Sequence, residues 1–173
     1  MTINELKQYL NKSSNPYLLI LIGPPLSGKD TVIRQLDLDD VVIVSRDQIL
    51  LDVYGSDNYD EAFKNVNQKK VDSVLLSTIQ KASKEGKNVI INMTNMTRKR
   101  RMYHLEFFNE DYNKVAVIFP ILDSAEYDRR NMKRKEEENK FIPSHVLKNM
   151  ISSYQTVDKQ KEGFDRVISL TIK

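Results

Sequence analysis

The sequence contains no cysteine among its 173 residues, so disulfide bonds and thiolate chemistry are excluded. It has no apolar run near the ~18 residues that a membrane-spanning helix needs. Residues 1–16 also lack the apolar core of a secretory signal. We therefore expect a cytoplasmic protein without a membrane partner.

The sequence also lacks a large excess of charge of one sign. The 27 basic and 24 acidic residues give a formal net charge of +3, which is too small to indicate a nucleic-acid partner without clustering. Hydrophobic residues make up 40% of the chain and charged residues 29%, as is usual for a globular protein. The length predicts a single domain, residues 1–173.

One motif stands out against this ordinary composition. An apolar run, residues 17–22, leads into a G-x-x-x-x-G-K frame, which is typical of a phosphate-binding loop. We expect the two glycines to permit unusual backbone conformations and Lys29 to supply a positive charge for the outer phosphates. The nucleotide-binding residues of this phosphate loop (residues 23–31) are then Gly23, Pro24, Pro25, Leu26, Ser27, Gly28, Lys29, Asp30 and Thr31.

The residue after the lysine departs from the usual motif. Serine or threonine normally stands there and binds magnesium, whereas this chain has Asp30 followed by Thr31. A carboxylate is a hard oxygen ligand that suits Mg²⁺. Asp30 could therefore bind the metal, or it could simply favour the positive end of the following helix.

Apolar strands alternate with helical patterns along the rest of the chain. Strands are predicted at 17–22, 41–44, 89–91, 114–119 and 166–172, and helices near 3–10 and at 29–36, 59–84, 97–108, 123–140 and 143–154. This alternation predicts an α/β fold with a five-stranded parallel sheet covered by helices on both faces. Ligands of such sheets bind beyond the carboxyl ends of the strands, so we look for chemistry there.

Asp47 follows the second predicted strand and is the candidate general base, because a carboxylate there could orient a hydroxyl and take its proton. Alternatively, Ser45 caps a helix and Asp47 merely lies in its first turn. Residues 98–101 are four consecutive cations at a helix start, where they oppose the helix dipole unless anions are near. Arg98 and Arg101 share a helix face that could bind phosphate, or the cluster could be a solvated surface.

Arg130 and Arg134 lie one helical turn apart in a second basic stretch. They could neutralise a transferring phosphoryl group from a closing lid, residues 123–142, or the stretch could form surface ion pairs with Glu136–Glu138. Tyr54 and Tyr59 flank Gly55 and could stack on a base, although packing is the simpler interpretation. His104 and His145 lack the partners of a metal site or a triad.

Together these residues resemble the 5′-hydroxyl polynucleotide kinases of bacteriophage and bacteria, from Leu18 to about Ile168. The resemblance rests on the phosphate loop, on Ser45-Arg46-Asp47, on Thr94-Asn95 with the arginines that follow, and on Arg130-Asn131-x-x-Arg134. It implies a P-loop kinase fold with an arginine-bearing helical lid, ATP and Mg²⁺ as cofactors, and catalytic roles for Asp47, Lys29 and Arg134. It further implies acceptor contacts by Arg46, Thr94, Asn95, Arg98, Arg100 and Arg101, with Asp30 and Thr31 at the metal.

Two positions depart from the family pattern. Met93 replaces an aspartate and Leu50 replaces an arginine that helps to hold the acceptor nucleotide. The expected reaction is transfer of the γ-phosphate of ATP to the 5′-hydroxyl end of single-stranded RNA or DNA. A kinase of a nucleoside, nucleotide or other small hydroxyl compound and a non-catalytic nucleotide-binding switch stay as alternatives, and a homo-oligomer is left open.

Overall fold

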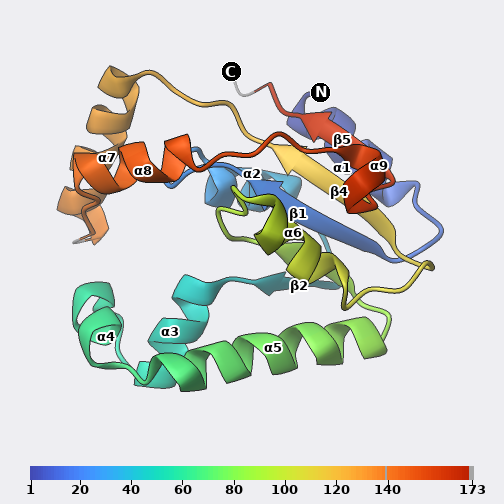
Figure 1. Cartoon of the computed structure of the whole chain (residues 1–173), viewed down its shortest axis with the longest axis horizontal. Helices are drawn as coiled ribbons and strands as arrows, with labels where there is room; N and C mark the ends of the chain where they lie inside the picture. Colours follow the sequence, from blue (N-terminus) through green and yellow to red (C-terminus); the bar gives the residue numbers. More distant parts are fainter. Residues whose placement is uncertain (139, 172–173) are drawn as a thin grey trace.

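The computed structural model describes residues 1–138 and 140–171, and a five-stranded sheet forms its centre (Figure 1). The strands are β1 (Tyr17–Ile22), β2 (Val41–Val44), β3 (Asn88–Ile91), β4 (Asn113–Ile118) and β5 (Arg166–Ser169). Their order across the sheet is β2-β3-β1-β4-β5, and every neighbouring pair is parallel. The predicted five-stranded parallel sheet is confirmed. The last predicted strand extended to residue 172, which lies outside the described residues.

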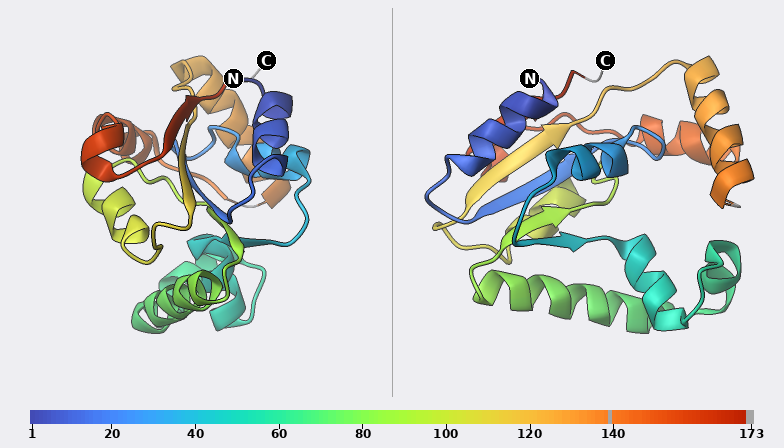
Figure 2. Two further views of the ribbon diagram at one scale, coloured as in Figure 1. Left: turned by 90° about the vertical axis from the view of Figure 1, so that its right-hand side faces the viewer. Right: turned by 180° about the vertical axis from the view of Figure 1, so that it is seen from behind.

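Helices cover both faces of this sheet (Figure 2). They are α1 (Ile3–Asn11), α2 (Lys29–Leu36), α3 (Arg46–Tyr54), α4 (Tyr59–Asn65), α5 (Gln68–Lys84), α6 (Arg98–Leu105), α7 (Ser124–Glu138), α8 (Ser144–Ser152) and α9 (Lys159–Glu162). Side chains of α1 and α2 pack on one face, and those of α5 and α6 pack on the other. Within residues 1–138 and 140–171, no helix combines the length and the apolar character that spanning a membrane requires.

The central strand β1 is buried along its whole length, which explains its unbroken apolar sequence. Alternate residues point to opposite faces of a strand. Leu18 and Ile20 therefore join the α5 and α6 layer, whereas Leu19 and Leu21 join the α1 and α2 layer. Each such buried side chain contributes about 1.5–3 kcal/mol to folding. The phosphate loop thus starts from the most firmly packed strand of the molecule.

The single helix predicted over residues 59–84 is wrong, because the chain forms α4 and α5 instead. Val66 between them is extended, and the side chain of Asn67 accepts a hydrogen bond from the backbone N–H of Lys70 at 3.2 Å. Asparagine at this cap position begins a new helix. The structure also contains α3, which starts directly after the cap residue Ser45 and ends at Tyr54. The following residue, Gly55, has a φ of +81°. Because α3 ends at Tyr54 and the next helix begins after a short turn, Tyr59 is the first residue of α4.

The carboxyl ends of all strands meet at one edge of the sheet, and two helical groups stand beyond that edge. Figure 1 shows α7 and α8 on one side of it and α3 and α4 on the other, and the reverse view in Figure 2 agrees. The phosphate loop follows β1 between these groups. This arrangement places the candidate site where parallel α/β sheets bind ligands.

Candidate active site

The phosphate loop joins β1 to α2 through a backbone that needs its glycines for two different reasons. Gly28 has a φ of +96°, in the left-handed region that favours glycine. Gly23 does not have a positive φ, but a Cβ added there would lie 2.8 Å from the Cβ of Phe119 and 2.8 Å from the Oγ of Ser27. The expected conformational role therefore applies to Gly28, whereas Gly23 is required by close packing. Leu26 also adopts a positive φ of 66°.

Lys29 places its charge inside this loop. Its Nζ donates hydrogen bonds to the carbonyl oxygens of Gly23 at 2.9 Å and Pro24 at 2.7 Å. Burial, aided by the nearby charge of Arg134, lowers the pKa of Lys29 to about 8, against the opposing carboxylates of Asp30 and Asp47. Charges from the phosphate loop (Asp30), from α3 (Asp47) and from α7 (Arg134) therefore all affect the protonation of Lys29.

Asp30 and Thr31 differ as metal ligands. The Oδ1 of Asp30, an exposed residue, accepts a hydrogen bond from Nδ2 of Asn92 at 2.7 Å, directly after β3. The hydroxyl of Thr31 instead accepts a hydrogen bond from Arg34 at 3.3 Å on the outer side of α2. The carboxylate of Asp30 is therefore suited to bind a metal ion together with phosphate oxygens. The positive charge of Arg34 makes the Thr31 hydroxyl a less suitable ligand. Among the described residues no three His, Cys, Asp or Glu side chains converge as a metal cluster.

Asp47 lies in the first turn of α3, opposite the phosphate loop. Ser45 caps this helix, since its Oγ accepts a hydrogen bond from the N–H of Gln48 at 3.4 Å. The carboxylate of Asp47 is exposed, and its Oδ1 accepts a hydrogen bond from the hydroxyl of Tyr59 at 3.1 Å. The geometry therefore shows the Ser45 cap with Asp47 in the first turn, and the role of Asp47 as a general base stays a prediction.

Two arginines of α7 approach the phosphate loop from the other side. Nη1 of Arg130 donates to the carbonyl oxygen of Leu26 at 2.9 Å, and Nε donates to Glu126 at 2.6 Å. Hydrogen bonds from Arg129 and Arg130 lower the pKa of Glu126 to about 2. Arg134 forms an ion pair with Glu138 at 3.3 Å, yet its charge also reaches Lys29. The expected surface pairs therefore form, and α7 contacts the loop as well.

The prediction that Arg101 contacts the acceptor is wrong. Its side chain is fully buried, and its Nε and Nη2 donate to the carboxylate of Glu162 at 2.6 and 2.8 Å. Its Nη1 also donates to the carbonyl oxygens of Asn95 and Met96. Arg98 pairs with Glu162 at 3.6 Å, so the two arginines do share a helix face. That face meets α9 rather than the site.

Asn95 is likewise a structural residue rather than a surface contact. It is 1% exposed with a φ of 48°, and its Nδ2 donates to the carbonyl oxygen of Leu21 at 2.7 Å. The preceding Thr94 accepts a hydrogen bond on its carbonyl oxygen from the N–H of Gly23 at 3.0 Å. This turn therefore joins the end of β3 to the start of the phosphate loop, and its buried amide is shielded from an acceptor.

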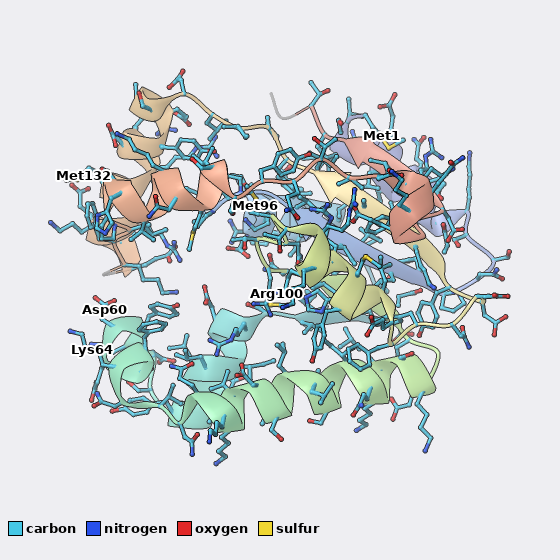
Figure 3. The ribbon with its side chains drawn as sticks, in the orientation of Figure 1. Met1, Asp60, Lys64, Met96, Arg100 and Met132 are labelled. Atoms are coloured by element: carbon cyan, nitrogen blue, oxygen red, sulfur yellow. The ribbon has the colours of Figure 1, made fainter. Side chains whose placement is uncertain are left out.

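The other expected acceptor residues lie at the surface. Arg46 donates to Gln68 at 2.8 Å and pairs with Asp72 at 3.0 Å on α5. Arg98 and Arg100 are exposed at the start of α6, where Figure 3 labels Arg100. Arg98 pairs with Glu162, and a phosphate contact by Arg100 stays a prediction.

Sequence reasoning missed two features of this region. It did not identify Asn92 as the partner of Asp30, although Asn92 directly follows a strand, the place where we looked for chemistry. It also left Tyr59 as a packing or stacking residue, without the hydrogen bond to Asp47. Tyr54 packs beside Leu50 and donates to Glu61 at 3.1 Å. His104 is fully buried, both its ring nitrogens lack partners within the described chain, and burial lowers its pKa to about 4.

A match to a protein-family model identifies the family of this chain. Residues 18–157 match the family AAA_33, described as an AAA domain. The chain belongs to the AAA_33 family. None of the curated proteins matches it in sequence.

Solved structures similar to this AAA_33 domain share its fold. A chain of the Pnkp1/Rnl/Hen1 RNA repair complex is 28% identical with a TM-score of 0.65, over 90% of this chain and 48% of that one. A chain of the PezAT toxin-antitoxin system of Streptococcus pneumoniae is 19% identical with a TM-score of 0.65, over 96% and 73% of the two chains. Chaetomium thermophilum Kti12 in complex with ADP-AlF3 is 15% identical with a TM-score of 0.61, over 89% and 88%.

These similarities confirm the P-loop kinase-like fold, which implies nucleotide binding. The chain spans about half the length of the RNA repair protein that it resembles.

Proposed function

We propose that this AAA_33 domain transfers the γ-phosphate of ATP to the 5′-hydroxyl end of RNA or DNA. One observation carries the proposal. Nζ of Lys29 donates to the carbonyl oxygen of Gly23 at 2.9 Å, Nη1 of Arg130 on α7 donates to the carbonyl oxygen of Leu26 in the same loop at 2.9 Å, and the charge of Asp47 on α3 opposes the lowering of the Lys29 pKa. A carboxylate, a loop lysine and a lid arginine therefore surround the same small region, as phosphoryl transfer to a hydroxyl requires.

The chain's own residues account for the steps of this reaction. The Asp47 carboxylate takes the proton of the acceptor hydroxyl while the acceptor oxygen bonds to the γ-phosphorus. The bond from that phosphorus to the bridging oxygen breaks, and ADP leaves. Lys29, Arg130 and Arg134 stabilise the negative charge on the phosphoryl oxygens.

Asp30 is the residue that would hold Mg²⁺, with Asn92 orienting its carboxylate through the 2.7 Å hydrogen bond. When bound, Mg²⁺ neutralises charge on the β- and γ-phosphate oxygens. Because Mg²⁺ commonly binds one or two carboxylates together with substrate phosphates, a single carboxylate beside the loop suffices.

A nucleic-acid acceptor is supported by two observations. The RNA repair protein named above is 28% identical to this chain over 90% of its length. Arg100 is exposed at the start of α6, next to the turn that holds the phosphate loop. Exposed arginines suit phosphate groups of a polynucleotide because guanidinium forks bind them in bidentate fashion.

A small hydroxyl compound is the second candidate acceptor, and the packing of Leu50 favours it. Leu50 is fully buried beside Ala62 and Val71, and Met93 packs against the main core. Neither side chain offers the charge that an arginine and an aspartate supply in the polynucleotide kinases. Acceptor recognition in this chain must therefore use other residues.

The test is a labelling experiment with γ-labelled ATP, Mg²⁺ and a panel of 5′-hydroxyl oligonucleotides and nucleosides. We expect label on the oligonucleotides. Asp47→Asn should lower turnover by about 10²–10⁴-fold, the usual contribution of a general base, with ATP affinity nearly unchanged. Asp52→Asn is the matched control, because Asp52 is an exposed carboxylate on the same helix that bonds only to Gln48 at 2.9 Å.

Label on nucleosides alone would select the small-molecule kinase. ATP binding without transfer to any acceptor would select the nucleotide-binding switch. Full turnover in Asp47→Asn would remove Asp47 from the reaction.

A further inference from the structure

Tyr59 connects the acceptor side of the site to the lid. It is the first residue of α4, and its hydroxyl donates to Oδ1 of Asp47 at 3.1 Å. The two residues belong to different helices, separated by the turn at residues 55–58. The contact therefore depends on how α4 sits against α3.

The ring of Tyr59 is held from the other side of the site. Nζ of Lys140, just beyond α7, lies 4.9 Å from the centre of the Tyr59 ring. The Phe63 ring stacks on it with centroids 6.0 Å apart and an interplanar angle of 24°. Figure 3 shows the two sides, with Asp60 and Lys64 marking α4 and Met132 marking α7. One side chain thus contacts both the candidate base and the lid segment.

The charges around Tyr59 keep its hydroxyl protonated. Burial, together with the charge and hydrogen bond of Asp47, raises the pKa of Tyr59 to about 12, against the opposing charges of Arg134 and Arg46. A phenol in this state donates its hydrogen bond throughout the neutral range. The Tyr59 hydroxyl can therefore donate to Asp47 at any pH in the neutral range.

We propose that Tyr59 is a positioning residue, which fixes the Asp47 carboxylate for the acceptor hydroxyl and couples that orientation to the lid through Lys140. The proposal rests on the proposed kinase function. With Oδ1 held by Tyr59, the second oxygen of Asp47 is the one that takes the acceptor's proton. Nucleotide bound under Arg130 and Arg134 holds α7 in place, and Lys140 passes that placement to Tyr59.

Kinetic measurements on four variants test the coupling. Tyr59→Phe removes the hydroxyl but keeps the ring, and we expect kcat to fall about tenfold, as the loss of one hydrogen bond to a charged group implies, with the KM for ATP within twofold. Lys140→Met should lower kcat about threefold, in line with one cation–π contact. If both residues act through one ring, the double variant should be less than threefold slower than Tyr59→Phe. Independent effects would make it fully threefold slower.

Tyr54→Phe is the matched control and should keep wild-type kcat, because the Tyr54 hydroxyl donates to Glu61 rather than to Asp47. A merely structural Tyr59 would lower the melting temperature and leave kcat per folded molecule unchanged. Wild-type kcat in Tyr59→Phe together with an inactive Asp47→Asn overturns the positioning role and leaves the kinase function standing.

A second measurement does not require activity. In protein labelled with ¹³C-tyrosine, the Tyr59 ring resonance at neutral pH should shift in Asp47→Asn, because the hydroxyl loses its hydrogen bond to a charged carboxylate. Tyr59→Phe assigns the resonance. An identical Tyr59 resonance in wild type and Asp47→Asn would show that the two groups do not interact and would overturn the proposal, whatever the acceptor proves to be.

Discussion

The two halves of the candidate site are built in different ways. On the donor half, main-chain groups of the phosphate loop are bonded by other elements. The N–H of Gly23 donates to Thr94, and the carbonyl of Leu26 accepts from Arg130 at 2.9 Å. On the acceptor half, exposed side chains bond to one another, as in the pair Asp47 and Tyr59. In the proposed reaction, backbone geometry thus defines where a phosphate binds, and side chains define which hydroxyl meets it.

This difference predicts that the donor half tolerates fewer substitutions than the acceptor half. A backbone cradle accepts few sequence changes, since Gly23 and Gly28 leave no room or conformation for substitution. An exposed side chain such as Asp47 can change without disturbing the core. Proteins with similar sheets can therefore keep nucleotide binding and differ in acceptor.

The largest expected effect would come from the lid. Arg134→Ala should lower turnover about 10³-fold or more, because cationic groups over a transferring phosphoryl group contribute on this scale. Lys133→Ala on the same helix is the control, since Lys133 forms only an exposed pair with Glu137 at 3.7 Å. Single-turnover kinetics would separate chemistry from binding. A near-wild-type rate in Arg134→Ala would assign α7 to the scaffold instead.

The next effect concerns Arg101, which the structure assigns to the scaffold. Glu162→Gln should lower the free energy of unfolding by about 3–5 kcal/mol, because it leaves the buried Arg101 charge without its partner. The melting temperature should fall by roughly 10 °C for a chain of this size. Glu137→Gln, at an exposed pair, should change stability by less than about 1 kcal/mol. Lost turnover at unchanged stability would instead place Arg101 in the site.

The smallest effect is a pH dependence of the donor half. Burial lowers the pKa of Lys29 to about 8, so the amine is protonated below this pH and neutral above it. ATP affinity should therefore weaken about tenfold between pH 7 and 9, as the charged fraction falls. In Lys29→Arg, which stays charged, ATP affinity should be flat over this range. Titration calorimetry measures both, and equal profiles would show that Lys29 is not the titrating group.

Local patterns in the sequence predicted much of the fold and of the donor half. The unbroken apolar run of β1 and the glycine-lysine spacing need no knowledge of distant residues. The alternation of strands and helices then predicted the parallel sheet, which the structure confirms. The split between α4 and α5 was missed because an apolar period continues across Asn67, while the cap that interrupts it is a single polar residue.

Side-chain roles were harder to predict, because they depend on what a helix face meets. Arg98 and Arg101 were correctly placed on one face, yet that face contacts Glu162 from α9, more than 60 positions along the chain. The link between Tyr59 and Lys140 joins residues that lie even farther apart in the sequence. Spacing within a helix contains no information about such partners.

The contact between Gly23 and Phe119 has a consequence for engineering and for evolution. The missing side chain at position 23 faces the first side-chain carbon at position 119, which every residue except glycine carries. The neighbouring ends of β1 and β4 therefore cannot both bear a side chain unless the two backbones separate. A side chain at position 23 would also meet the Oγ of Ser27 at 2.8 Å. An attempt to replace the glycine would therefore have to redesign the phosphate loop together with the end of β4, and any lineage that lost the glycine would need compensating changes at both contacts.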